Sequence, residues 1–96
     1  NKIFFVANSK INGLGLFVNV DMPKDSILFE AIKSDKTVTY LGSKVNHCNN
    51  PNTTLIEYNN SWFLISNKNL KKYDELTANY NDTPYFIKKA DPSWIC

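Results

Sequence analysis

The sequence contains no arginine, because all 11 of its basic residues are lysine. Arginine is the residue that most often reads guanine and clamps phosphate with paired hydrogen bonds, so its absence argues against sequence-specific nucleic-acid binding. The net charge of +2 points to no particular partner. No apolar run approaches the ~20 residues that a membrane-spanning helix needs, and we expect no membrane partner.

Cysteine is scarce as well. The two cysteines, Cys48 and Cys96, are too few for a disulfide framework. They could form one bond, but unpaired thiols in a reducing, intracellular location are the expectation, since no signal peptide is visible. With the single histidine they make three Cys/His side chains, fewer than the four ligands of a structural zinc site. We therefore predict no metal site.

Glycine and proline are also few, at three and four residues, which excludes a low-complexity chain. What is present suits one small domain spanning residues 1–96. Hydrophobic residues make up 43% of the chain and aromatic residues 14%, enough for a modest core with several large side chains.

Short β-prone segments separated by turn residues fill most of the chain. They predict strands at residues 2–6, 16–20, 27–32, 37–41, 53–58, 62–66 and 76–80. Asn59-Asn60 predicts a hairpin turn. No segment keeps a 3.6-residue period for ~12 positions, so helices are limited to short turns near 34–36, 42–45 or 84–89. The predicted fold class is mostly β, with several small sheets.

Three segments carry chemistry. The first is Asn12-Gly13-Leu14-Gly15, followed by Phe17. Two glycines around one residue allow positive φ and a close backbone approach to a ligand, although an isolated Gly-x-Gly is more often a simple turn between strands. A dinucleotide-binding fingerprint is excluded, because a third glycine and a following helix are missing.

The second segment, residues 45–52, holds the only histidine in Asn46-His47-Cys48. Asparagine and proline are ordinary turn formers, so a tight loop is one interpretation. A Cys-His nucleophile pair is disfavoured, because neighbouring side chains in an extended segment point to opposite faces. The third segment, residues 74–80, ends at Tyr80, and alone it reads as an edge strand with a half-buried tyrosine.

In this order, the three segments resemble the SET-domain protein lysine methyltransferases, from about Ile3 to Trp94. The departures are Cys48 for a serine and Tyr73-Asp74 for Gly-Glu. The resemblance implies a SET (β-clip) fold, with a pseudoknot-like crossing of the second and third segments. It also implies a core of residues 1–80 and a C-terminal tail of residues 81–96.

The family uses S-adenosylmethionine and releases S-adenosylhomocysteine. Its glycine turn wraps the cofactor, its asparagine contacts the amino-acid end, its histidine backbone contacts the adenine edge, and a tail tryptophan stacks on the ring. The resemblance therefore implies a set of cofactor-binding residues: Asn12, Gly13, Leu14, Gly15, Asn46, His47, Tyr80 and Trp94. It implies no metal.

Methyl transfer to lysine explains the tyrosine. The amine must arrive neutral although its free pKa is about 10.4, and a narrow apolar channel lowers that pKa. A phenol oxygen can orient the amine and accept a weak C–H hydrogen bond from the methyl group. Tyr80 is the predicted catalytic residue. The predicted lysine-channel residues are Tyr40, Leu55, Ala78, Tyr85 and Phe86; Ala78 leaves room for di- or trimethylation.

The resemblance implies a protein-lysine N-methyltransferase, with a histone tail as a candidate substrate and the nucleus or a host-cell nucleus as a candidate location. Residues 33–45 are shorter than the family's usual groove wall. A partner protein, the substrate or a second copy in a homodimer could supply the wall. The alternative is a SET-fold module with weak or no turnover that recruits a protein partner.

Overall fold

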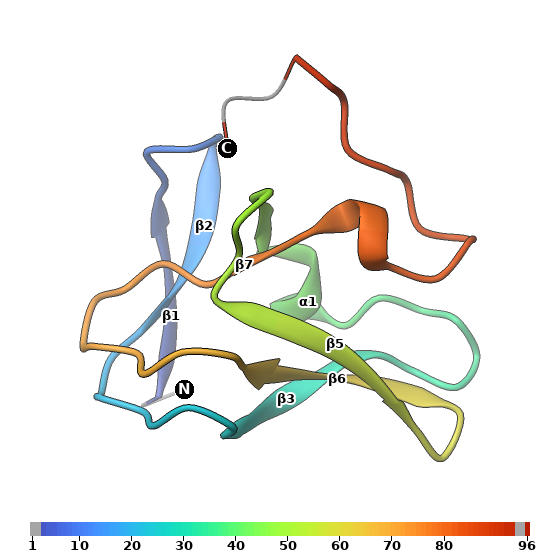
Figure 1. The fold of residues 1–96 in the computed structure, drawn as a ribbon, viewed down its shortest axis with the longest axis horizontal. Helices are drawn as coiled ribbons and strands as arrows, with labels where there is room; N and C mark the ends of the chain where they lie inside the picture. The colour runs from blue at the N-terminus through green and yellow to red at the C-terminus, as the bar shows by residue number, and fades with distance from the viewer. Residues whose placement is uncertain (1–2, 94–95) are drawn as a thin grey trace.

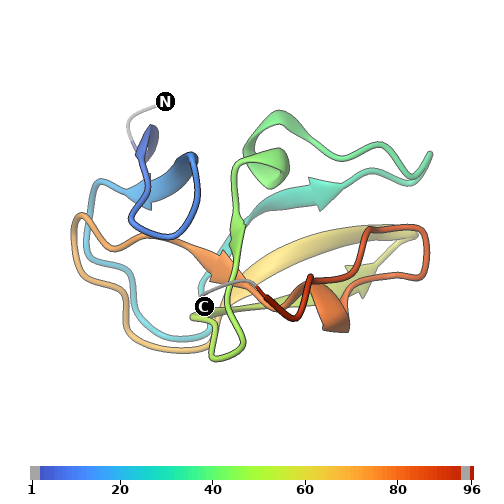
Figure 2. The same cartoon turned by 90° about the horizontal axis from the view of Figure 1, so that it is seen from above.

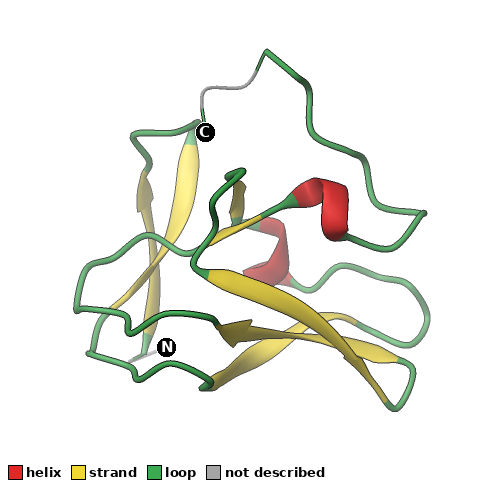
Figure 3. Cartoon of the chain, in the orientation of Figure 1, coloured by secondary structure: helices red, strands yellow, loops and turns green. Residues whose placement is uncertain are grey.

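The computed structural model describes residues 3–93 and 96. Within them the elements follow the order β1 (Phe4–Asn8), β2 (Leu14–Val18), β3 (Ile27–Ile32), α1 (Tyr40–Ser43), β4 (Asn46–His47), β5 (Thr53–Tyr58), β6 (Ser61–Ser66), β7 (Thr77–Ala78) and the 3-10 turn η1 (Tyr80–Asp82). Strands and connecting loops dominate the chain (Figure 3). The predicted class, mostly β with few short helices, is confirmed.

The described strands form three small sheets rather than one large one. β1 pairs with β2, β3-β6-β5 make a three-stranded sheet, and β4 pairs with β7. The β1–β2 hairpin and the three-stranded sheet lie on opposite sides, with β4 and β7 between them (Figures 1 and 2). The first two strands begin and end about two residues away from the prediction, because Ser9 N–H donates to Gly13 C=O at 2.8 Å and sets the loop between them.

The β5–β6 hairpin follows the prediction closely. β5 has the predicted bounds, and β6 begins one residue earlier than predicted, at Ser61. Asn59 and Asn60 have φ values of 50° and 65°. Two successive positive φ values characterise the two-residue turn whose twist matches that of paired strands, and asparagine tolerates them.

The predicted strand at residues 37–41 is wrong apart from one bridge between Ile32 and Val38. Thr39 is the N-cap of α1: its Oγ1 accepts a hydrogen bond from Gly42 N–H at 3.1 Å and donates to Glu30 C=O at 2.8 Å. Threonine is β-prone, but its hydroxyl also competes for backbone groups at a helix start. Here the cap outweighs the strand preference, and α1 overlaps the helical turn expected near residues 42–45.

β7 is held from both sides by one segment, residues 46–53. On one side it pairs in parallel with β4, and Cys48 N–H donates to Ala78 C=O at 3.0 Å. On the other side, Thr77 N–H donates to Asn52 Oδ1 at 2.9 Å, and Thr53 Oγ1 donates to Thr77 C=O at 2.7 Å. The predicted pseudoknot-like crossing is therefore confirmed, and we call this arrangement the crossing.

The core lies where the sheets meet the crossing. Leu16, Leu70 and Leu76 are its largest fully buried side chains. Each such side chain contributes about 1.5–3 kcal/mol through burial of apolar surface. Leu76 directly precedes β7, so the core anchors the strand that leads to Tyr80. No helix among residues 3–93 has the length and apolar character to span a membrane.

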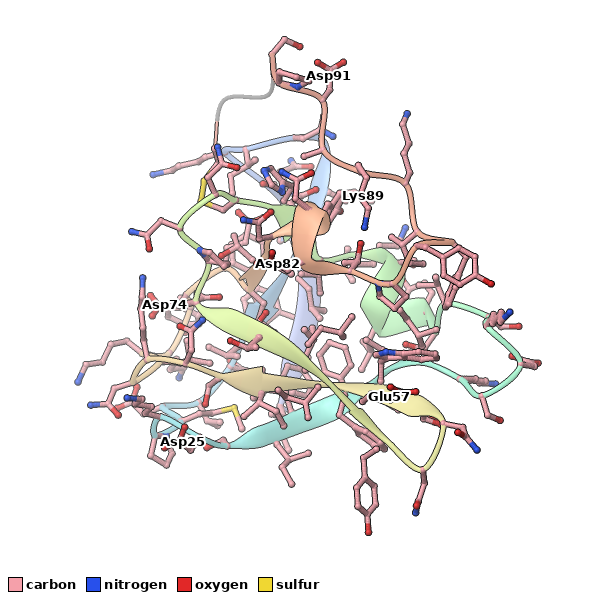
Figure 4. All side chains as sticks on the ribbon, turned by 45° about the vertical axis from the view of Figure 1, so that its right-hand side comes forward. Asp25, Glu57, Asp74, Asp82, Lys89 and Asp91 are labelled. Carbon is pink, nitrogen blue, oxygen red and sulfur yellow. A yellow bond between two sulfur atoms is a disulfide. The ribbon has the colours of Figure 1, made fainter. Side chains whose placement is uncertain are left out.

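The expectation of unpaired cysteines is wrong. Cys48 and Cys96 form a disulfide with a Cα–Cα distance of 4.4 Å (Figure 4). Asn49 N–H also donates to Cys96 C=O at 2.9 Å. The sequence separates the two cysteines by 48 residues, and only the return of the tail to the loop after β4 brings them together. The bond fastens the C-terminal end to the crossing.

Candidate active site

Glu75 joins the glycine turn to the crossing. Ser9 Oγ donates to its carboxylate, 2.9 and 2.8 Å from the two oxygens, and Asn46 Nδ2 lies 3.0 Å from Oε2. Asn46 Nδ2 also lies 3.0 Å from the carbonyl oxygen of Asn12 and 3.1 Å from that of Leu14. Three segments that are distant in the sequence are therefore joined by one side-chain network, which we call the Glu75 network.

The two glycines of the turn serve different needs. Gly13 has φ +47°, and a Cβ added there would meet nothing within 4 Å. Gly15 has no positive φ, but an added Cβ would lie 2.3 Å from Oε2 of Glu75. Gly13 is thus needed for backbone conformation, whereas Gly15 makes room for the carboxylate.

His47 is buried, and both its ring nitrogens have partners. Tyr80 N–H donates to Nδ1 at 3.0 Å, so Nδ1 is an acceptor. Nε2 must then carry the proton that it shares with Asn49 Oδ1 at 2.9 Å. The two bonds fix one neutral tautomer. The ring also lies edge-on to the Tyr80 ring, with centroids 5.3 Å apart, so His47 positions Tyr80.

Tyr80 stands where β7 passes into η1, and its hydroxyl donates to Val45 C=O at 2.5 Å. Partial burial raises the pKa of the Tyr80 phenol above its ordinary value of 10.0. The phenol therefore stays protonated at neutral pH. Because its proton points at Val45, the oxygen presents lone pairs to a second group that approaches from elsewhere.

A cavity of about 570 Å³ adjoins Tyr80. Leu55 and Ala78, two of the predicted channel residues, line it together with Tyr80. Apolar side chains from the core and sheets form much of its wall, including Ile32 and Leu64. An apolar wall beside a phenol oxygen is the environment that disfavours a charged amine and can orient a neutral one.

The other predicted channel residues lie elsewhere. Tyr85 and Phe86 line a neighbouring hollow of about 410 Å³, which shares Leu55 with the Tyr80 cavity. Tyr40 is 67% exposed on α1, lines neither hollow, and has the Lys44 ammonium 5.5 Å from its ring centroid. The structure thus groups Leu55 and Ala78 with Tyr80, and separates Tyr40 from them.

The predicted cofactor residues form a second group. Asn12, Leu14, Gly15 and Asn46 meet in the Glu75 network, and His47 links this network to Tyr80. Trp94, expected to stack on adenine, lies outside the described residues. Among the residues described, no cluster of three or more His, Cys, Asp or Glu side chains could hold a metal ion.

Glu75 and Asn52 are site residues that the sequence analysis missed. Asn52 Nδ2 donates to Glu75 C=O at 2.8 Å, while its Oδ1 accepts from Thr77 N–H. A signal was available for Glu75, because it lies inside the segment that leads to Tyr80. Its carboxylate partners, however, are 66 and 29 positions away in the sequence, and no local pattern reveals them.

The acceptor oxygens at the Glu75 network suit the ammonium group at the amino-acid end of S-adenosylmethionine. Asn46 directs its amide N–H groups inward, and among residues 3–93 and 96 its Oδ1 accepts no hydrogen bond. An amide oxygen close to a carboxylate is a fitting acceptor environment for an ammonium group. The open space at Gly13 leaves the turn accessible from outside.

No protein-family model matches this sequence, and no curated protein matches it. Among the solved structures that resemble it is the crystal structure of a "putative histone methyltransferase" from Plasmodium falciparum. The two share 17% sequence identity and superpose with a TM-score of 0.62, over 80% of this chain and 91% of that one. At this identity the likeness concerns architecture, and the chain has the SET-type fold predicted from its three segments.

Proposed function

We propose that this protein is a protein-lysine N-methyltransferase that uses S-adenosylmethionine. The observation that carries the proposal is the position of the Tyr80 hydroxyl, which donates to Val45 C=O beside an apolar cavity. The fold shared with the Plasmodium structure, itself described as a putative histone methyltransferase, supports the same reaction class.

S-adenosylmethionine supplies an electrophilic methyl group, and the chain's own residues prepare the amine. The apolar cavity lowers the pKa of an entering lysine below its ordinary value of about 10.4, so the amine gives up its proton to water. The Tyr80 oxygen then accepts a hydrogen bond from the neutral amine and fixes its direction. Alignment of two reacting atoms at roughly 3 Å is a large part of such catalysis.

The Glu75 network is the proposed holder of the cofactor's amino-acid end. Asn46 Oδ1 would accept from the ammonium group, and Glu75 would favour its positive charge. His47 serves by fixing Tyr80 N–H through Nδ1. The adenine end is assigned to the backbone near His47 and to Trp94, which stays a prediction.

The proposed substrate is a lysine side chain of a protein, with a histone tail as the first candidate because of the description of the Plasmodium structure. Ala78 lines the cavity and fills little of it, so di- or trimethylation is sterically allowed. Residues 33–38 are all exposed. A partner, the substrate or a second copy that covers them would complete the groove.

Two measurements test the proposal. S-adenosylhomocysteine at ~100 times its Kd should raise Tm by about 10 °C, since a ligand bound only by the folded form stabilises it. Labelled S-adenosylmethionine with core histones should give label transfer. Tyr80→Phe should lower turnover on the order of 100-fold, as removal of one positioned polar group at a reacting centre does, with little change in cofactor affinity.

The matched control is Tyr58→Phe, which removes a hydroxyl from a side chain that is 66% exposed on β5. Unchanged turnover in Tyr80→Phe would contradict the catalytic assignment. Cofactor binding without transfer to any core histone would instead favour the alternative, a SET-fold module that recruits a partner.

A further inference from the structure

Three rings meet beside the Tyr80 cavity. Trp62 from β6 lies edge-on to Phe86 with centroids 5.5 Å apart at 74°, and Tyr85 lies edge-on to Phe86 at 5.5 Å and 87°. Edge-to-face pairs leave parts of the π faces turned outward. We call Trp62, Tyr85 and Phe86 the aromatic corner, and it lines the hollow of about 410 Å³.

A lysine of the chain itself already occupies this corner. The Lys36 Nζ lies 5.6 Å from the centroids of both Tyr85 and Phe86, and it donates to the Tyr85 hydroxyl at 3.2 Å. Ring faces attract ammonium and guanidinium groups, and an aromatic pocket that encloses an ammonium is a recognised means of cation binding. The corner is therefore suited to a cation in both geometry and charge.

Two carboxylates also line the hollow. Glu57 from β5 and Asp82 from η1 both line it and are exposed (Figure 4). Among the described residues, neither forms a salt bridge with Lys36, whose ammonium group contacts the two rings and the Tyr85 hydroxyl. The titratable groups that face the hollow thus carry two negative charges and one positive charge, and removal of Lys36 leaves only the negative ones.

Lys36 is a replaceable occupant. It has φ +71°, a backbone conformation that lysine rarely adopts, in a turn where residues 33–38 are all exposed. Cation–π contacts at exposed sites are weak. A competing cation held nearby at high effective concentration would displace the Lys36 side chain without unfolding anything.

The hollow lies next to the cavity that Tyr80 lines. Leu55, Asp82 and Thr83 line both. A chain segment that placed one side chain in the cavity would bring a neighbouring side chain to the aromatic corner. This juxtaposition supplies the high local concentration that displacement of Lys36 requires.

We propose that the aromatic corner, with Glu57 and Asp82, binds a second basic side chain of the protein substrate, a lysine or arginine near the target lysine, and that Lys36 occupies the site until that side chain displaces it. The claim that this side chain belongs to a substrate rests on the proposed methyltransferase function. The binding of a basic side chain at the corner does not, so the two claims can fail separately.

The binding experiment uses acetyl-Gly-Lys-Gly-amide as the probe, and the same tripeptide with norleucine as the neutral control. The reporter is the indole N–H resonance of Trp62, assigned by its loss in Trp62→Phe. In Lys36→Asn, where a short residue tolerates positive φ, the lysine probe should bind at least threefold more tightly than to the parent chain. Lys33→Asn removes a charge from the same turn and should match the parent.

The norleucine control should leave the Trp62 resonance in place. The proposal is overturned if the lysine probe fails to shift that resonance in Lys36→Asn, or if norleucine shifts it equally, because the corner would then be a merely apolar surface. Tyr80→Phe should bind the lysine probe as the parent does. Binding of the lysine probe at the aromatic corner can therefore be detected even in a protein without methyltransferase activity.

A kinetic experiment tests whether the aromatic corner takes part in substrate recognition. A glycine-rich peptide with one lysine and one nearby arginine should have a KM at least threefold lower than the same peptide with citrulline for arginine, at similar kcat. Phe86→Leu should abolish this difference. Equal KM values in the parent chain, where methyl transfer itself is present, would overturn the role of the corner in substrate recognition.

Discussion

The crossing and the C-terminal tail are held in different ways. At the crossing, buried and half-buried polar side chains bond directly to the backbone of β7, as Asn52 and Thr53 do. In the tail, no described residue of 81–93 is buried, and neither is Cys96. Ring contacts, hydrogen bonds such as that from Asn49 N–H to Cys96 C=O, and one disulfide hold the tail. Tyr80 stands at the junction. The difference indicates that buried contacts fix the surroundings of Tyr80 on the side of the crossing, whereas the exposed tail constrains them less on the other side.

The largest expected effect comes from opening the disulfide. Cys96→Ser should lower the free energy of unfolding by about 4 kcal/mol, because the bond closes a loop with a sequence separation of 48 residues and restricts the unfolded chain. Denaturant titration under oxidising conditions measures this. With a strong reductant, the parent and the variant should unfold at the same concentration; a parent insensitive to reductant would show that the tail does not depend on the bond.

The crossing should depend on Asn52. Asn52→Ala leaves Thr77 N–H and Glu75 C=O without their partner and should cost about 2–3 kcal/mol, since two half-buried backbone groups lose hydrogen bonds. Denaturant titration is again the measurement. Asn50→Ala, at an exposed neighbouring position, is the control and should change stability by less than about 0.5 kcal/mol. Equal effects would mean that the crossing is held by packing alone.

A smaller effect separates the two glycines of the turn. Gly15→Ala drives a Cβ into Glu75 and should cost about 2 kcal/mol, along with weaker binding of S-adenosylhomocysteine. Gly13→Ala meets open space and should cost about 1 kcal/mol, from positive φ alone. Thermal unfolding and calorimetry with S-adenosylhomocysteine compare them. Identical losses of stability and of binding in the two variants would show that the Glu75 carboxylate does not require a glycine at position 15.

The smallest expected effect is a pH dependence of the folded protein's stability that arises from Tyr80. Burial raises the pKa of Tyr80 in the folded chain, so between the unfolded and folded pKa values the folded state holds more protons. Stability associated with Tyr80 is therefore full below about pH 10 and is lost as pH rises above it. Denaturant titrations at pH 9 and pH 11 should show a smaller fall in Tyr80→Phe than in the parent. An equal fall would mean that Tyr80 is as solvated when folded as when unfolded.

Local chemistry explains why some elements are predictable. The β5–β6 hairpin follows from two runs of β-branched and aromatic residues and from two asparagines that accept positive φ, all within 14 residues of chain. The strand expected at residues 37–41 failed because Thr39 caps α1 through Gly42 N–H, a local contact that competes with β propensity, and because its hydroxyl also donates to Glu30 C=O on β3. Tyr80 lies beside a cavity, and its catalytic role stays a prediction; its partner Val45 C=O and the tautomer of His47 emerge only from contacts across the crossing.

The resemblance of three short motifs, in their order, to one family led to the predicted SET-type architecture and to the choice of Tyr80, because each motif is a short run that can be read without knowledge of distant contacts. Tertiary structure alone decided the pairing of Cys48 with Cys96, the joining of Ser9, Asn46 and Glu75, and the placing of Lys36 on the aromatic corner. Those contacts join residues tens of positions apart. The energies of these contacts depend on distances between atoms in the folded chain, and the order of residues along the sequence does not give those distances.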